Sequence, residues 1–337
     1  MDASALRDAA IAVWRDWLVV VHKPRRLAIV KERDELRKRM SRANANLAAD
    51  GTYSLALRHD GIACWGDNVF GQAPPDGVPG DFVAIAAGAA QSLAIRRDGN
   101  IVCWGRNGYG QAPPDGIQGD FVAIAAGQYH SLALRRDGRI ACWGDNGYGQ
   151  APPNGVPGDF VAISAGPAHS LALRRDGSIA CWGSNFNGRA PPDGIPGDFV
   201  AIAADEYHSL ALRRDGRIAC WGSNGYGQAP PDGVDGDFVA VAAGFSHSLA
   251  LRRDGSVACW GTNGDGEAPP DGVAGDFIAI AAGNQHSLAL RRDGRIACWG
   301  DNDDGQAPTP EDDEEYDEDD YATLSANFPF MTDVHML

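Results

Sequence analysis

Residues 47–300 contain no lysine, and residues 301–337 contain neither lysine nor arginine. Residues 1–46 hold eleven Lys and Arg against six Asp and Glu, residues 47–300 hold eighteen Arg against 26 acids, and the remainder holds thirteen acids, for a net charge of -16. Because contacts with phosphate need a basic surface, the acidic composition of residues 47–300 argues against DNA as the partner.

The chain also lacks an unbroken run of about 20 apolar residues, which a membrane-spanning helix needs. Charged residues interrupt the N-terminal apolar stretch, so it does not resemble a secretory signal. The odd number of cysteines, with no Cys-x-x-Cys step, favours reduced thiols, so we expect an intracellular protein, cytoplasmic or nuclear. Binding to a membrane surface through Trp17 to Val21, flanked by Lys23, Arg25 and Arg26, is a weaker alternative.

Catalytic signatures are missing as well. We find no phosphate-binding loop, no nucleophile elbow and no zinc-ligand spacing, and no Cys-x-x-Cys occurs. The sequence therefore predicts no enzyme, no cofactor and no metal site.

A unit of 39 residues, typified by residues 120–158, fills most of the chain. The tryptophan of its Cys-Trp-Gly step recurs at intervals of 39 residues, as Trp65, Trp104, Trp143, Trp182, Trp221, Trp260 and Trp299. A fixed period of this size is typical of solenoids and propellers.

Each unit predicts a three-stranded antiparallel sheet with a short fourth edge. Phe121 begins a β-prone run, Ser131-Leu-Ala-Leu alternates with period two, and Ile140 to Trp143 forms the return strand after an Asp-Gly turn. Seven such sheets bury both faces only by packing around an axis. We therefore predict an all-β fold, a seven-bladed β-propeller over residues 47–308.

Several side chains recur at one place in every unit. Seven cysteines lie on separate blades, which predicts reduced thiols rather than disulfides. Five units carry a histidine at one site, where the other two units have Tyr53 and Gln91. This variation favours a structural hydrogen bond over a metal site. A glycine such as Gly127 follows each first strand, with Asp50 and Asp205 as exceptions, and we interpret this position as a left-handed turn.

The pattern Ala-Gly-x-x-His-Ser-Leu-Ala-Leu, then Asp-Gly, then Cys-Trp-Gly-x-Asn-x-x-Gly-Gln resembles the repeats of the regulator of chromosome condensation family. The resemblance covers about residues 47–308 and implies a seven-bladed propeller. It implies several functions, among them nucleotide exchange on a small GTPase, chromatin docking and enzyme inhibition. The exchange factors use an insertion in the propeller, which the constant interval of 39 rules out here.

Outside the propeller, residues 1–46 predict a helical arm of two helices broken near Pro24. Trp14 and Trp17 lie on its apolar stripe and are candidate anchors for a partner or for self-association. The alternative is that the arm packs on its own propeller.

Closure of the ring has two candidate strands, because the first unit begins imperfectly. Residues 44–50 depart from the sequence of the other first strands. Residues 320–327, at the end of the acidic run Glu311 to Asp320 in the segment 309–337, match that sequence conservatively. We favour residues 320–327, pairing with the first blade so that no edge stays open. The acidic run is expected to be a solvated loop, with contact to a basic surface as the alternative.

Six Arg-Arg pairs precede the Asp-Gly turns. We expect one arginine of each pair to bind an aspartate as structural support, and an anion-recognising ring containing Arg136, Arg175 and Arg214 is the alternative.

Aromatic residues vary between units at two loop positions, and exposed aromatics at such positions are typical of protein interfaces. The candidate partner-binding residues are Tyr129, Tyr207, Phe245, Tyr109, Tyr148 and Tyr226. We predict a non-catalytic adaptor or scaffold that binds a protein partner over one loop ring. The alternatives are a regulator of a small GTPase or a chromatin-docking protein, and a structural subunit anchored by the N-terminal helices.

Overall fold

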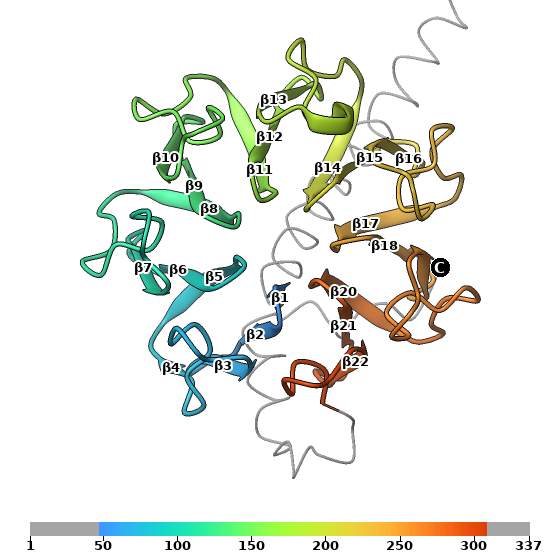
Figure 1. Ribbon diagram of the computed structural model, residues 1–337, viewed down its shortest axis with the longest axis horizontal. Coiled ribbons are helices and arrows are strands. Elements are labelled where there is room, and N and C mark those ends of the chain that lie inside the picture. Colours follow the sequence, from blue (N-terminus) through green and yellow to red (C-terminus); the bar gives the residue numbers. More distant parts are fainter. Residues whose placement is uncertain (1–46, 309–337) are drawn as a thin grey trace, which may run out of the picture. The chain divides into compact units, whose positions relative to one another are not determined.

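The computed structural model describes residues 47–308, which form seven small antiparallel sheets, here called blades one to seven in chain order. In Figure 1 the blades follow one another around a ring, with one strand of each blade nearest the axis. The predicted helical arm, with Trp14 and Trp17, and the segment 309–337 lie outside the described residues.

Each blade has an inner, a middle and an outer strand. The inner strands are β1 (Leu47–Asp50), β5 (Phe82–Ala87), β8 (Phe121–Ala126), β11 (Phe160–Ala165), β14 (Phe199–Ala204), β17 (Phe238–Ala243) and β20 (Phe277–Ala282). The middle strands are β2 (Tyr53–Leu57), β6 (Gln91–Arg96), β9 (His130–Arg135), β12 (His169–Arg174), β15 (His208–Arg213), β18 (His247–Arg252) and β21 (His286–Arg291). The outer strands are β3 (Gly61–Gly66), β7 (Ile101–Gly105), β10 (Ile140–Gly144), β13 (Ile179–Gly183), β16 (Ile218–Gly222), β19 (Val257–Gly261) and β22 (Ile296–Gly300).

The predicted fourth edge is present. Blade one adds β4 (Val78–Pro79), and five later blades make a single bridge at the same place, such as that between Ile140 and Val156. A short 3-10 turn, η1 (Phe186–Gly188), is the one helical element of the described residues.

The core lies between neighbouring blades. Leu132 and Leu134 of β9 point toward blade four and pack with Phe160 and Ala172. Ala133, between them, faces the other way and joins the cluster formed with blade two. The period-two alternation therefore places large side chains on one face of each sheet and small ones on the other, so consecutive blades fit together.

Residues 47–50 build the innermost strand of blade one, where we had favoured residues 320–327. All four residues of β1 pair with β2, from Leu47 with Ala56 to Asp50 with Tyr53. Leu47 and Ala56 also pack with Leu288 and Ala279 of blade seven. The register explains the result, because four residues are enough to cover the inner edge of β2.

The glycines after the inner strands were interpreted wrongly. Gly88, Gly127, Gly166, Gly244 and Gly283 do not have positive φ, unlike Gly138 of the Asp-Gly turn at 86°. A Cβ on Gly127 would instead collide with the His130 ring and with the carbonyl oxygen of Gly166 in the next blade. The inner strands converge here, and lack of space rather than backbone angle selects glycine.

Candidate functional site

Every seam between blades is closed by the same polar contacts. One loop carbonyl of each blade accepts two hydrogen bonds from the next blade, as Gln111 does from Ser131 Oγ at 3.0 Å and Trp143 Nε1 at 2.8 Å. The seam between blades seven and one has the same pair, because Gln306 accepts from Ser54 at 3.1 Å and from Trp65 at 2.9 Å. The tryptophans are thus positioned by the seams.

The five periodic histidines also bridge blades, which confirms the structural interpretation. Each Nε2 lies 2.8–3.1 Å from a serine Oγ of the next blade, as His130 does from Ser170. Since that serine donates its proton to a carbonyl, the histidine Nε2 must carry the hydrogen that it donates. Burial lowers the pKa of His130 to about 4 and that of His169 to about 3, so both are neutral near pH 7.

Six cysteines at the 39-residue spacing, from Cys64 to Cys259, are thiols in no disulfide, as predicted. Burial raises the pKa of each to about 12. Such thiols are poor nucleophiles at neutral pH.

The ring has two distinct faces, because each strand runs from one to the other. The hairpin face carries the Asp-Gly turns between the middle and outer strands. The loop face carries the turns before the middle strands and the loops after the outer strands, whose residues are 50–52, 88–90, 127–129, 166–168, 205–207, 244–246 and 283–285 together with 67–72, 106–111, 145–150, 184–189, 223–228, 262–267 and 301–306.

The arginine pairs lie on the hairpin face and support the structure, as expected. The second arginine of each pair places Nε 2.5–2.9 Å from the aspartate that precedes the inner strand, as Arg136 does with Asp120 and Arg175 with Asp159. Arg214 pairs in the same way with Asp198. The first arginine stacks on the phenylalanine of the inner strand, with Cζ 4.6–5.6 Å from the ring centroid. Because these pairs are exposed, solvent screens them and each contributes little to stability.

The loop face carries the candidate aromatic residues. Tyr109, Tyr148 and Tyr226 occupy the tips of the loops after the outer strands and are 55%, 68% and 67% exposed. Phe70 and Phe186 occupy neighbouring tips at 49% and 66%. Five consecutive blades, one to five, therefore present an aromatic side chain to solvent.

Tyr129, Tyr207 and Phe245 lie lower on the same face, in the turns before the middle strands, and are half-buried. The Tyr129 ring packs on Tyr109 with centroids 4.9 Å apart, and Tyr207 meets Phe245 edge-on at 5.1 Å. These three residues therefore form the base of the aromatic surface rather than its exposed part.

Two arginines on this face were missed at the level of sequence. The guanidinium of Arg106 lies over both Phe70 and Tyr129, with Cζ 5.1 and 5.5 Å from the ring centroids. Arg189 is nearly buried and donates a hydrogen bond to the Glu206 carbonyl at 2.6 Å. Their signal was departure from the repeat, since Arg189 stands where most blades have glutamine.

Acidic side chains gather near the axis of the loop face. Asp50 and Asp205 take the place of the axial glycine in blades one and five, and Glu206 follows. Burial raises the pKa of Asp50 to about 7, and the charge of Glu206 adds to the rise. A hydrogen bond that the carboxylate accepts from Gly51 N at 2.6 Å acts in the opposite direction and lowers the pKa. Burial and the charges of Asp50 and Glu206 likewise raise the pKa of Asp205 well above its usual value.

Replacing Asp50 with asparagine is expected to stabilise the ring above neutral pH by about 1–2 kcal/mol. Below pH ~4 the aspartate is protonated in both the folded and the unfolded chain, so its raised pKa has no effect there. Its cost grows as pH rises toward the folded value of about 7. Urea denaturation at pH 4.5 and pH 8 measures the difference, and Asp232→Asn, exposed on a connecting turn, is the control. An equal gain at both pH values would contradict a charge effect.

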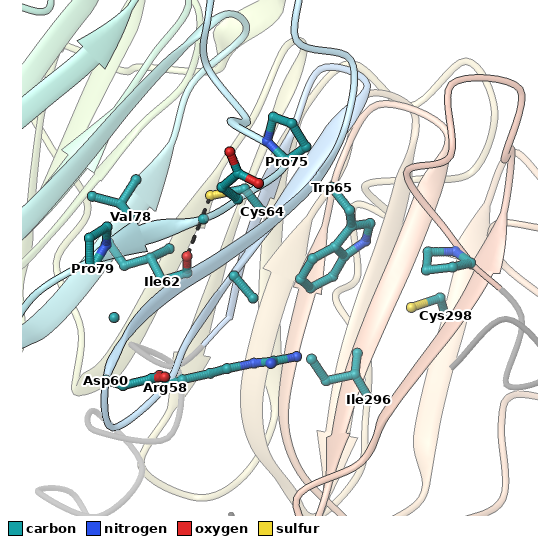
Figure 2. Close-up of a pocket in the computed structure, with 15 residues that line it drawn as sticks. Arg58, Asp60, Ile62, Cys64, Trp65, Pro75, Val78, Pro79, Ile296 and Cys298 are labelled. Carbon is teal, nitrogen blue, oxygen red and sulfur yellow. Dashed lines mark hydrogen bonds between the residues drawn. The ribbon is translucent and has the colours of Figure 1, made fainter. Parts of the chain in front are cut away.

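A cavity of about 500 Å³ lies between the outer strands of blades one and seven (Figure 2). Ile62, Cys64 and Trp65 line it from β3, and Ile296 and Cys298 from β22. Its walls combine apolar side chains with the charged side chains of Arg58, Asp60 and Asp76.

Within residues 47–308, no group of three His, Cys, Asp or Glu side chains is placed to hold a metal ion. The same residues include no helix that is long and apolar enough to cross a membrane.

The structure thus defines a seven-bladed β-propeller with an aromatic and acidic loop face and an arginine–aspartate hairpin face. The sequence profile of the regulator of chromosome condensation (RCC1) repeat matches residues 82–111, 121–150, 160–189, 199–228, 238–267 and 277–306. The chain belongs to this family. No curated protein sequence matches it significantly.

Solved structures with the same fold include proteins from plants and yeast. The CRINKLY WD40 ectodomain of the Arabidopsis thaliana receptor kinase ACR4 is 25% identical, with a TM-score of 0.63 over 78% of this chain and 98% of that one. The ectodomain of the Physcomitrella patens receptor kinase CR4 is 25% identical, with a TM-score of 0.60 over 76% and 72%. Prp20p from Saccharomyces cerevisiae, described with its binding to Gsp1p and histones, is 20% identical, with a TM-score of 0.59 over 84% and 85%.

Proposed function

We propose that the propeller is a non-catalytic adaptor that binds a protein partner through its loop face. The observation that carries this proposal is the row of exposed aromatic tips on five consecutive blades, Phe70, Tyr109, Tyr148, Phe186 and Tyr226. Large aromatic side chains supply much of the binding energy of protein interfaces, at low cost in conformational entropy.

The tips are not needed by the fold, which supports a role in binding. The seam contacts use the serine, the tryptophan and the loop carbonyl of each blade, and the tip side chains take no part in them. Blades six and seven have Asp265 and Asp304 at the corresponding place. An aromatic residue is therefore not required there for a blade to form.

Contacts between side chains hold the base of the surface. Tyr109 rests on Tyr129, and Arg106 joins Phe70 to Tyr129, so these side chains are held before a partner arrives. A surface that is ordered in the free protein loses less side-chain entropy on binding.

The triple change Tyr109→Ala, Tyr148→Ala and Tyr226→Ala is expected to abolish capture of the partner, with a loss of about 100-fold in affinity once the partner is purified. Partners are identified by mass spectrometry after capture on the full chain. They are then titrated against the variant by calorimetry.

The matched control removes exposed apolar side chains that lie outside the loop face. Val83, Val122 and Val161 are 43%, 42% and 42% exposed on the inner strands, and their change to alanine should leave the affinity within about twofold. Equal loss in both variants, or no loss in the tyrosine variant, would refute binding through the loop face.

A further inference from the structure

The loop face is strongly acidic as well as aromatic. Its turns and loops contain ten acids, Asp50, Asp67, Asp145, Asp205, Glu206, Asp265, Glu267, Asp301, Asp303 and Asp304. They contain two basic residues, Arg106 and Arg189, so the difference of ten and two gives a formal charge of −8. Asp50 and Asp205 contribute less negative charge near neutral pH, because their pKa values are raised. The exposed carboxylates of this face repel phosphate groups and attract cations.

Aromatic and acidic tips occupy separate arcs of the ring. The five aromatic tips lie on blades one to five, whereas blades six and seven present the exposed carboxylates of Asp265, Asp303 and Asp304. Asp50 of blade one and Asp205 and Glu206 of blade five lie near the axis, at or just after the ends of inner strands that Figure 1 shows converging.

Guanidinium groups already occupy sites of this kind within the chain. Arg106 stacks on two aromatic rings of the loop face itself. On the hairpin face, Arg136 pairs with the carboxylate of Asp120. The neighbouring Arg135 stacks on Phe121, with its Cζ 4.6 Å from the ring centroid. Within the described residues, guanidinium groups thus bind both to carboxylates and to ring faces, although each of these arginines makes one of the two contacts.

We propose that the partner supplies a basic segment, rich in arginine and lysine, that lies across the loop face from the acidic tips of blades six and seven to the aromatic tips of blades one to five. Its cations pair with the exposed carboxylates and stack on the exposed rings. The inference rests on the proposed function and adds the chemistry of the partner to it.

The test is fluorescence anisotropy of a labelled peptide of alternating arginine and serine, titrated with the full chain at ~0.15 M salt, where distant charges are screened. Asp265→Asn, Asp303→Asn and Asp304→Asn together are expected to weaken binding about tenfold. Tyr148→Ala with Tyr226→Ala should weaken it several-fold more through lost cation–π contacts. The same peptide with glutamate in place of arginine should not bind.

The matched control removes the same charge elsewhere. Asp193, Asp232 and Asp271 are exposed on the connecting turns, outside the loop face, and their change to asparagine should alter affinity less than twofold. Thermal unfolding confirms that each variant is folded.

Three results would overturn the proposal. Equal weakening by both triple variants would show attraction to net charge alone, and no weakening by either would remove the carboxylates from the site. A gain in peptide affinity after changing Lys23, Arg25 and Arg26 to glutamine would identify the chain's own basic segment as the occupant. If the peptide fails while the tyrosine variant still loses its captured partner, the loop face remains the binding surface and only the basic chemistry is wrong.

Discussion

Replacing Gly127 with alanine is expected to destabilise the ring by about 2–3 kcal/mol, although the change adds one methyl group. That group would collide with the carbonyl oxygen of Gly166, which belongs to the backbone of the next blade, and with the ring of His130. The imidazole cannot turn away without losing Ser170, its partner across the seam. The measurement is the midpoint of urea denaturation.

The chain offers a control and a precedent. Gly108 has no atom within 4 Å of an added Cβ and does not have positive φ, so Gly108→Ala should be neutral or slightly stabilising. In blade five, where Asp205 replaces the glycine, the hydrogen bond from its N–H to the His208 carbonyl lengthens to 3.3 Å, against 2.9 Å for Gly127. Equal stability of Gly127→Ala and Gly108→Ala would show that blade three relaxes without cost.

Acid is expected to unfold the propeller by protonating the seam histidines. Burial holds the pKa of His208 and His286 at about 4 and that of His247 at about 3, whereas an unfolded histidine titrates near 6.5. Between pH ~6.5 and ~4 the unfolded chain binds more protons, so stability falls as pH falls. Each histidine contributes a slope of up to about 1.4 kcal/mol per pH unit, and five of them cost several kcal/mol by pH ~4.

Two sets of carboxyl groups also titrate in or near this pH range, and their effects on stability differ from those of the histidines. The carboxyls of Asp50 and Asp205 act in the opposite direction over part of this range, because their pKa values are raised. The paired aspartates of the hairpin face, such as Asp120, have lowered pKa values and lose their contribution only below pH ~4.

His247→Gln isolates one histidine. Glutamine is the natural residue at this site in blade two, where Gln91 Nε2 donates to the Gly127 carbonyl at 2.5 Å. We expect the variant to stay folded at pH 7.5. The slope of its unfolding free energy against pH should correspond to about one proton fewer taken up on unfolding than in the parent chain. Denaturation curves between pH 7.5 and pH 4 test this, and an unchanged slope would mean that His247 is not the titrating group.

The sequence could predict the structural features that depend on the residues of a single repeat. Strands, turns and the pairing of Arg136 with Asp120 depend on residues within one repeat, and the period of 39 supplied the number of blades. The contact of His130 with Ser170 could not be predicted, because every unit has its own serine next to the histidine and only the packing of blades selects the neighbour's.

The loop face was partly predictable for the same reason. Tyr109, Tyr148 and Tyr226 stood out by variation between units, and the structure places them at exposed tips. Asp50 and Asp205 are far apart in sequence and looked like turn residues, so their approach at the axis required the closed ring. The place of Arg136, Arg175 and Arg214 on the other face likewise depends on strand direction within the folded blade.

The seams have a consequence for how such a molecule can diversify. Each blade is one uninterrupted stretch of chain, and it meets its neighbours through a serine, a tryptophan and a carbonyl that do not depend on the tip residue. A mutation at one tip therefore leaves the joints of the ring intact. Recognition can therefore evolve blade by blade.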